Sequence, residues 1–173
     1  MSMCAGQGRD VLGVLVDHPR APDVTARLVE LDPDLVTEAR AATKKAHLGG
    51  VEIVEGDAGC SALYEGIVPA NVVLVCGVFG NIGDDDIRTT IFELPRLCAD
   101  GAAVIWTRHR RAPDLTSTIR GWLDEAGFDE VAFDTEEPFA FGVGTHRFVG
   151  RPGPFRRDRR MFTFVGDGTD ALL

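Results

Sequence analysis

Two glycines near the amino terminus stand where a backbone turn can come close to a bound ligand. Gly6 and Gly8 flank Gln7, directly after the short apolar run 1–5. Glycine has no Cβ that would clash with a ligand, and a helix that starts after the turn offers unpaired backbone N–H groups. The turn therefore predicts a cradle for a nucleotide-like ligand.

A carboxylate stands at the end of the second expected strand, residues 24–31. Glu30 can accept hydrogen bonds there from both hydroxyls of a ribose. A G-x-G turn alone is as readily an ordinary strand-to-helix turn, and it is the pairing with Glu30 that favours nucleotide binding. Dinucleotide enzymes carry a third glycine three positions after the second, where this chain has Val11. An NAD-dependent oxidoreductase is therefore the disfavoured alternative.

The composition is that of a globular protein with a real core. The chain has 173 residues, 45% of them hydrophobic and 26% charged. Its net charge of −9 disfavours general affinity for a nucleic-acid backbone, and no apolar run reaches the roughly 18 residues of a membrane span. The four cysteines form no C-x-x-C or Cys/His cluster, which predicts reduced thiols in a cytoplasmic protein and no zinc or other metal.

Strands that alternate with helices predict an α/β fold with a doubly wound, mostly parallel sheet. The expected strands are residues 1–5, 24–31, 51–54, 70–76, 102–107, 128–134 and 143–149. The expected helices are residues 9–18, 33–47, 61–65, 84–98 and 116–126. The last two strands follow one another without a helix, which predicts an antiparallel hairpin at one edge. A further β-like run covers 160–165.

From Met3 to about Val165, the sequence resembles the class I S-adenosylmethionine-dependent methyltransferases. Their first motif ends in a G-x-G turn that is often followed by Arg-Asp, as in residues 6–10, and their second strand ends in an acid often followed by Asp-Pro, as in residues 30–33. The resemblance implies a seven-stranded Rossmann-like sheet in the order 3-2-1-4-5-7-6. It also implies S-adenosyl-L-methionine as cofactor and methyl transfer to a small-molecule acceptor.

The same resemblance implies one methyltransferase domain over residues 1–173. Its cofactor-binding half would cover about 1–83 and its carboxyl-terminal half about 84–165, followed by a tail at 166–173. The first expected strand begins at Met1, which is short for a strand at the centre of a sheet. We therefore expect a preceding segment, which would complete the strand and supply a helical lid, to be missing. A truncated, non-catalytic remnant that binds cofactor or a partner without turnover is the alternative function.

The cofactor-binding residues that the resemblance implies lie at four strand ends. They are Ala5, Gly6, Gln7, Gly8, Glu30, Leu31, Asp57, Ala58, Cys76, Gly77 and Val78. Glu30 would hold the ribose and Leu31 would pack on the adenine. Asp57 would accept a hydrogen bond from the adenine amino group, or cap the following helix, and the two roles are compatible. Cys76 to Val78 would lie beside the methionyl group, or form a plain glycine loop.

Two positions depart from the family pattern. An acid that meets the cofactor's ammonium group usually stands near the end of the first strand, where this chain has Ser2, and Cys4 replaces a glycine. Serine carries no charge, so we expect weak cofactor affinity unless another acid substitutes.

Two histidines near expected strand ends, His109 and His146, are the candidates for a general base. A solvated loop histidine is the plain alternative for each. Arginines that follow the fifth strand could bind an acidic acceptor, or form a solvated basic loop; they are Arg108, Arg110 and Arg111. Four further arginines at 156–160 are expected to lie on the surface.

Overall fold

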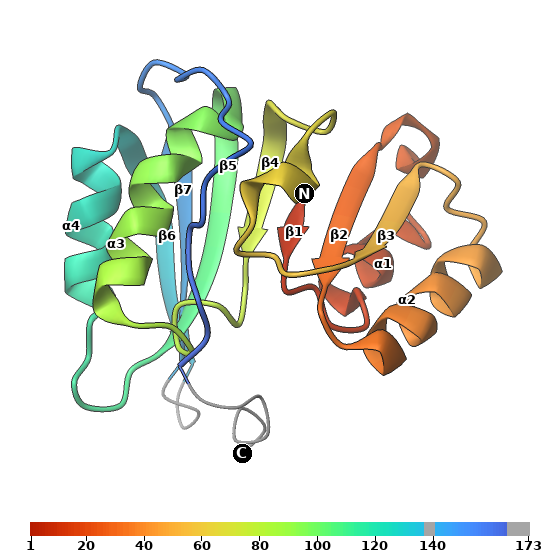
Figure 1. Cartoon of the computed structure of the whole chain (residues 1–173), viewed down its shortest axis with the longest axis horizontal. Coiled ribbons are helices and arrows are strands. Elements are labelled where there is room, and N and C mark those ends of the chain that lie inside the picture. Colours follow the sequence, from red (N-terminus) through yellow and green to blue (C-terminus); the bar gives the residue numbers. More distant parts are fainter. Residues whose placement is uncertain (137–140, 166–173) are drawn as a thin grey trace.

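The centre of the computed structural model, which describes residues 1–136 and 141–165, is a seven-stranded sheet. The strands are β1 (Ser2–Met3), β2 (Ala26–Glu30), β3 (Val51–Glu55), β4 (Ala70–Val75), β5 (Cys98–His109), β6 (Phe128–Glu136) and β7 (Phe141–Phe148). Their order is β3-β2-β1-β4-β5-β7-β6 (Figure 1). The first five pair in parallel, whereas β7 is antiparallel to β5 and β6. The expected order and the antiparallel edge are confirmed; the expected tail at 166–173 lies outside the described residues.

Strand β1 covers only Ser2–Met3, and is therefore even shorter than the predicted strand 1–5. It pairs with β2 on one side and, through a single residue, with β4 on the other. The two halves of the sheet therefore meet at a narrow seam. The expected preceding segment stays a prediction.

The helices form where the sequence places their start signals. They are α1 (Arg9–Leu15), α2 (Pro33–Lys45), α3 (Asp84–Glu93) and α4 (Thr116–Glu125), with short 3₁₀ turns η1 (Ala21–Asp23), η2 (Ser61–Tyr64) and η3 (Leu94–Arg96). Helix α2 begins after Asp32, whose carboxylate accepts from the N–H groups of Asp34 at 2.8 Å and Leu35 at 3.3 Å. The expected helix 84–98 ends early, because Pro95 has no N–H to continue the helical bonds.

Alternating residues of the strands separate two apolar clusters on opposite faces of the sheet. Leu28 of β2 packs with Leu12 of α1 in the smaller cluster. Its neighbour Val29 belongs to the larger cluster, together with Ile87 of α3 and Ile119 of α4. Helices α3 and α4 lie together on one side of the β5–β7–β6 half (Figure 1). The helices thus cover different faces in the two halves.

The segment 151–165, called the strap below, runs along α3 toward the end of β4 (blue in Figure 1). It carries two isolated bridges, Cys60 with Arg160 and Ile82 with Phe164, so the expected β-run at 160–165 is not a strand of the sheet. Its side chains nevertheless enter the core, because Met161 is 1% and Phe162 0% exposed. The strap therefore fills the space that the short turn η2 leaves between α3 and the sheet.

We expect Phe162→Ala to lower the free energy of unfolding by about 3–5 kcal/mol, the usual cost of a cavity left by a buried phenylalanine. Phe164, which packs edge-on against Phe162 and is 38% exposed, provides the control. Phe164→Ala should cost clearly less in the same urea titration. Equal losses would show that the strap does not anchor through Phe162.

Candidate functional site

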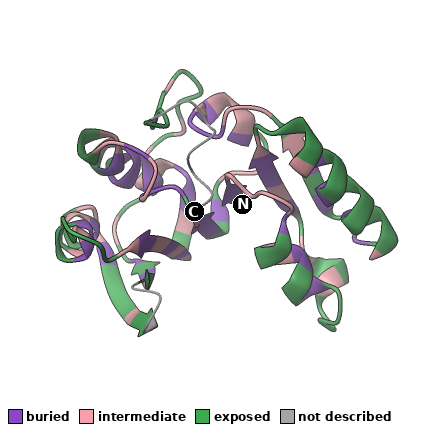
Figure 2. Ribbon diagram, turned by 90° about the horizontal axis from the view of Figure 1, so that it is seen from below, coloured by how far each residue is buried: buried purple, intermediate pink, exposed green. Residues whose placement is uncertain are grey.

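The loops that follow β1, β2, β3 and β4 leave the sheet at one edge, because these strands are parallel. Figure 2 looks onto this edge from below the view of Figure 1. In open α/β sheets, the crevice at this edge is where ligands bind. The candidate cofactor-binding residues, which the sequence places at these strand ends, are therefore expected along this crevice.

The carboxylate of Glu30 joins the end of β2 to the glycine turn. One oxygen, Oε2, accepts from the N–H of Gly6 at 2.7 Å, and the other, Oε1, accepts from Leu31 N–H at 2.8 Å and from Asp32 N–H at 3.0 Å. Next to it, Leu31 is 63% exposed, an apolar side chain left without cover. Glu30 and Leu31 thus present a carboxylate and an apolar surface at the same strand end.

The glycine turn has the backbone that the sequence predicted. Gly6 and Gly8 have φ angles of 54° and 73°, in the left-handed region that favours glycine. A Cβ on Gly6 would meet nothing within 4 Å, so the space over the turn is open. The side chain of Gln7 bonds to Glu38 of α2, and the N–H of Gly8 donates to the carbonyl of Ala5 at 2.8 Å. The turn is therefore held from both sides.

Asp57, after β3, has two partners. Its Oδ1 accepts from the N–H of Gly59 at 2.9 Å, within the turn before η2. The expected cap of the following helix is not formed, because Cys60 is the N-cap residue of η2 and no side chain caps it. Its Oδ2 accepts from the guanidinium of Arg160 at 2.8 Å. The following residue, Ala58, is buried and its carbonyl accepts from the Tyr64 hydroxyl at 2.9 Å.

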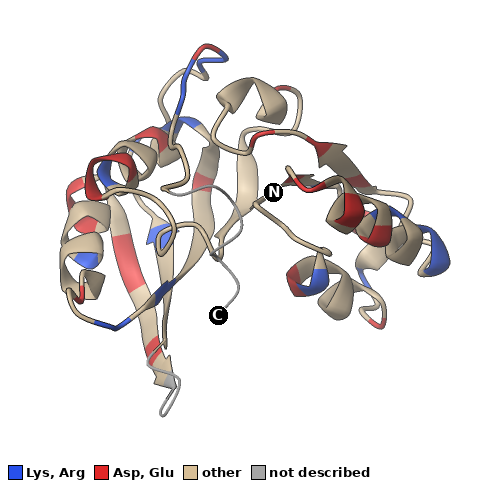
Figure 3. Cartoon of the chain, turned by 60° about the horizontal axis from the view of Figure 1, so that its bottom comes forward, with Lys and Arg blue, Asp and Glu red and all other residues tan. Residues whose placement is uncertain are grey.

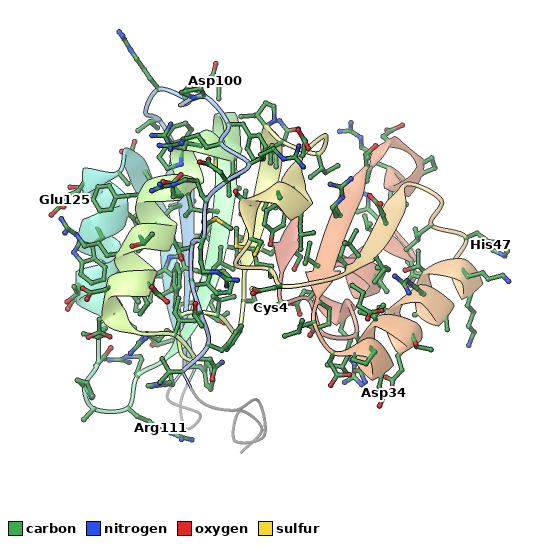
Figure 4. All side chains as sticks on the ribbon, viewed as in Figure 1. Cys4, Asp34, His47, Asp100, Arg111 and Glu125 are labelled. Atoms are coloured by element: carbon green, nitrogen blue, oxygen red, sulfur yellow. The ribbon has the colours of Figure 1, made fainter. Side chains whose placement is uncertain are left out.

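Cys4 lies at the centre of the edge, just past β1 (Figure 4). Burial, together with the negative charges of Glu30 and Asp57, raises the pKa of its thiol to about 12. The thiol is therefore protonated at pH 7. The two carboxylates that the sequence proposed for ribose and adenine are brought together around this residue.

The loop after β4 is pinned by its own polar groups. Gly77 N–H donates to the Thr107 hydroxyl at 2.9 Å, and Gly77 carbonyl accepts from the Asn81 amide at 2.7 Å. Val78 is fully buried and packs in the larger apolar cluster. Gly77 itself is exposed, with φ 70°.

Ser2 stands where the family pattern has an acid. It is 2% exposed and paired within the sheet, so its hydroxyl is not presented to a ligand. Another acid lies nearby. Burial, together with the negative charge of Asp10 in the first turn of α1, raises the pKa of the Cys76 thiol to about 11. Asp10 is therefore a carboxylate whose charge acts on the residue that follows β4. Nothing in the sequence pattern singled it out as a cofactor contact.

His109 is the histidine that the fold brings to this edge. It ends β5, and a Cβ on Gly80 of the β4 loop would lie 3.3 Å from its Cδ2. Its Nδ1 is buried without a hydrogen-bond partner among residues 1–136 and 141–165. Burial lowers the pKa of the ring, and the charges of Arg108 and Arg111 lower it further. The imidazole is therefore neutral at pH 7.

His146 does not lie at the carboxyl edge, contrary to the sequence-based placement. It faces Val104 across β5 and β7 and is 1% exposed. Its Nδ1 accepts from the Trp106 indole N–H at 3.3 Å. A Cβ on Gly144 would stand 2.3 Å from that indole, so the glycine makes room for it. His146 serves the core, and no acceptor reaches it there.

The arginines at and after the end of β5 have different surroundings. Arg108 lies within β5, is 7% exposed and donates to the carbonyl of Phe79, beneath the β4 loop, so little of it is exposed to an acceptor. Arg110 pairs with Asp114 at 3.3 Å, and Arg111 is exposed. Among the strap arginines, which the sequence placed on the surface, Arg160 pairs with Asp57 at 2.8 Å and is 52% exposed.

Charge on the rest of the surface is mixed, with acidic and basic segments interspersed (Figure 3). Among the described residues, no group of three or more His, Cys, Asp or Glu side chains could hold a metal ion. Within the same ranges, no helix is both long and apolar enough to cross a membrane.

No family model and no curated protein matches the sequence. Solved structures do resemble the fold. An O-methyltransferase family protein from Burkholderia thailandensis superposes with a TM-score of 0.69 at 20% identity, over 86% of this chain and 50% of its own. An RNA methyltransferase from Salinibacter ruber, in complex with S-adenosyl-L-homocysteine, gives 0.58 at 20% identity over 91% and 84%. The N-methyltransferase NodS from Bradyrhizobium japonicum gives 0.61 at 14% over 86% and 84%.

These likenesses establish the fold. The chain has the class I methyltransferase fold, with the sheet order that the sequence predicted. It spans about half the length of the Burkholderia protein. At this level of identity the site itself must be judged from the residues present.

We expect NMR titration to place the pKa of His109 below its ordinary 6.5, because burial and two arginines disfavour the charged ring. Arg111→Ala should raise that pKa by removing one of the charges. Arg151→Ala, at the start of the strap and past the far end of β7, is the control and should leave it unchanged. A His109 pKa at or above 6.5 in the parent would contradict the arrangement.

Proposed function

We propose that the chain binds S-adenosyl-L-methionine at the carboxyl edge of β1–β4 and transfers its methyl group to a small-molecule acceptor. The observation that carries this proposal is the carboxylate of Glu30. It lies 2.7 Å from the N–H of an open glycine turn and beside the exposed Leu31. The fold neighbours support the same class of reaction.

The residues present fit the adenosyl part of this cofactor. Three backbone N–H groups orient the Glu30 carboxylate, and a carboxylate has about four acceptor sites, so about one remains to accept from a ribose hydroxyl. Leu31 offers an apolar face to the adenine. Asp57 offers an acceptor to the adenine amino group, on the neighbouring strand end.

The cofactor supplies a methyl group that its sulfonium already activates. The protein's part is therefore mainly to hold the acceptor in line and to keep water out. His109 is the candidate base where the acceptor carries a proton, because its ring is neutral at pH 7 and stands beside the β4 loop.

A non-catalytic cofactor-binding protein is the second candidate function. Two observations favour it: Ser2 is buried where an acid is expected, and the carboxylate of Asp57 is already paired with Arg160. Each of these two features would weaken the binding of the cofactor, and neither involves the methyl acceptor. Binding without turnover is therefore the outcome that separates the two candidates.

Calorimetric titration with S-adenosyl-L-homocysteine and, separately, with NAD tests the proposal. Binding of S-adenosyl-L-homocysteine alone is expected. Binding of NAD alone would favour an oxidoreductase, which Val11 in place of a third glycine argues against. Binding of neither would remove the cofactor from the proposal.

Glu30→Gln should weaken the binding of S-adenosyl-L-homocysteine by about 1.5–3 kcal/mol, because hydrogen bonds to a charged acceptor are lost. Glu52→Gln is the matched control. Glu52 lies near the start of β3, away from the carboxyl edge, and pairs with Arg27 at 2.8 Å. Equal affinity in parent and Glu30→Gln, with both folded, would remove Glu30 from the ribose site.

Asp10 is the acid we propose in place of the missing one, as a partner for the cofactor's ammonium group. Asp10→Asn should weaken S-adenosyl-L-homocysteine binding several-fold and leave the binding of adenosine, which lacks the amino-acid part, unchanged. Asp17→Asn, just past the end of α1, is the control. An equal loss for both ligands would place the effect of Asp10 elsewhere.

A further inference from the structure

The strap places one further side chain, that of Arg160, at the proposed adenine site. The guanidinium of Arg160 donates through Nη1 to Asp57 Oδ2 at 2.8 Å and to the Phe162 carbonyl at 3.2 Å. Its Nη2 lies 3.4 Å from the Cys60 sulfur. The three partners fix the guanidinium over the turn that begins at Asp57.

The backbone of the strap delivers Arg160 to this place. Met161 N–H, the next along the chain, donates to the Gly59 carbonyl at 2.8 Å. A Cβ on Gly59 would lie 2.3 Å from the Phe162 carbonyl oxygen, so only glycine allows the approach. On the other side, Arg159 pairs with Glu93 of α3 at 3.0 Å. Arg160 therefore reaches Asp57 from a docked segment and not from a loose end.

We propose that Arg160 is a specificity-determining residue of the cofactor site, because its guanidinium competes with the 6-amino group of the purine for Asp57. This inference rests on the proposed function. It adds that the strap, and not only the strand ends, sets how tightly and how selectively the adenosyl group is bound.

The competition follows from the acceptors that Asp57 has to offer. Oδ1 accepts from Gly59 N–H and Oδ2 from Arg160, so each oxygen already has one donor. An incoming amino group must therefore share one of these oxygens with its present donor or displace the guanidinium. The side chains of Arg160 and Asp57 are 52% and 39% exposed, so the pair is screened and is worth little on its own. A ligand can therefore compete with it, at a cost that falls as salt weakens the pair.

The pair also changes which purine is preferred. A carboxylate alone accepts hydrogen bonds and so favours a 6-amino group over a 6-oxo group. A guanidinium only donates, so Arg160 can serve the 6-oxo group that Asp57 would reject. The parent chain should therefore discriminate poorly between adenosyl and inosyl ligands, and removal of Arg160 should sharpen the choice.

The test compares the full chain with Arg160→Ala, Arg160→Gln and the control Arg157→Ala. Arg157 lies on the same strap, 69% exposed and 3.8 Å from Glu65, so its loss removes the same charge without touching Asp57. Arg160→Gln removes the charge but keeps a donor and most of the side chain, in case alanine loosens the strap. S-adenosyl-L-homocysteine and S-inosyl-L-homocysteine are titrated calorimetrically at about 0.05 M and 0.5 M salt.

Both Arg160 variants should bind S-adenosyl-L-homocysteine about two- to five-fold tighter than the parent at low salt, the range expected from an exposed ion pair. The parent should gain affinity at high salt and the variants should not. The ratio of adenosyl to inosyl affinity should rise in the variants only.

Unchanged or weaker binding by both folded Arg160 variants, with measurable binding by the parent, would overturn this inference and leave the proposed function standing. The same gain in Arg157→Ala would overturn it too, since the effect would then be one of net charge. No binding of either ligand by the parent and all variants would overturn the proposed function, and this inference with it.

Discussion

The carboxylate of Glu30 is the contact on which the geometry of the candidate site depends. It accepts from the glycine turn after β1 and from the two residues that follow β2, so one side chain sets the spacing between two loops. Those N–H groups would otherwise need water or other partners at a partly buried edge. Because β1 is a two-residue strand, little sheet pairing could hold the turn without this carboxylate.

The strap is the second structural support, and it compensates for a weak connection between β3 and β4. The connection from β3 to β4 contains only the short turn η2, whereas α3 and α4 cover the neighbouring half of the sheet. Met161 and Phe162 supply the missing apolar volume, and the backbone bond from Met161 to Gly59 holds them beside η2. The same docking carries Arg160 to Asp57. One segment therefore contributes both to the core and to the contacts of Asp57 at the candidate site.

The two candidate histidines show that a residue's position along its strand determines whether its side chain is buried in the core. Along β7, Gly142, Gly144 and His146 share the buried face, and the glycines leave space for aromatic rings. His146 is thereby drawn into the core, where Trp106 donates to it. His109 ends β5 and keeps one side toward the β4 loop. Of the two, His109 is the one that lies beside a loop at the carboxyl ends of the parallel strands.

The sequence by itself determined the alternation of strands and helices and the residues that stand at the strand ends, because those signals are local. The sheet order came from the resemblance to the methyltransferases, and the structure confirms it. The glycine turn, the Asp32-Pro33 helix start and the apolar run of β4 each act within a few neighbours. Tertiary structure alone decided that Arg108 turns under the β4 loop and that Arg160 pairs with Asp57, 103 positions away. An exposed arginine looks the same in any sequence, and its partner depends on how a distant segment packs.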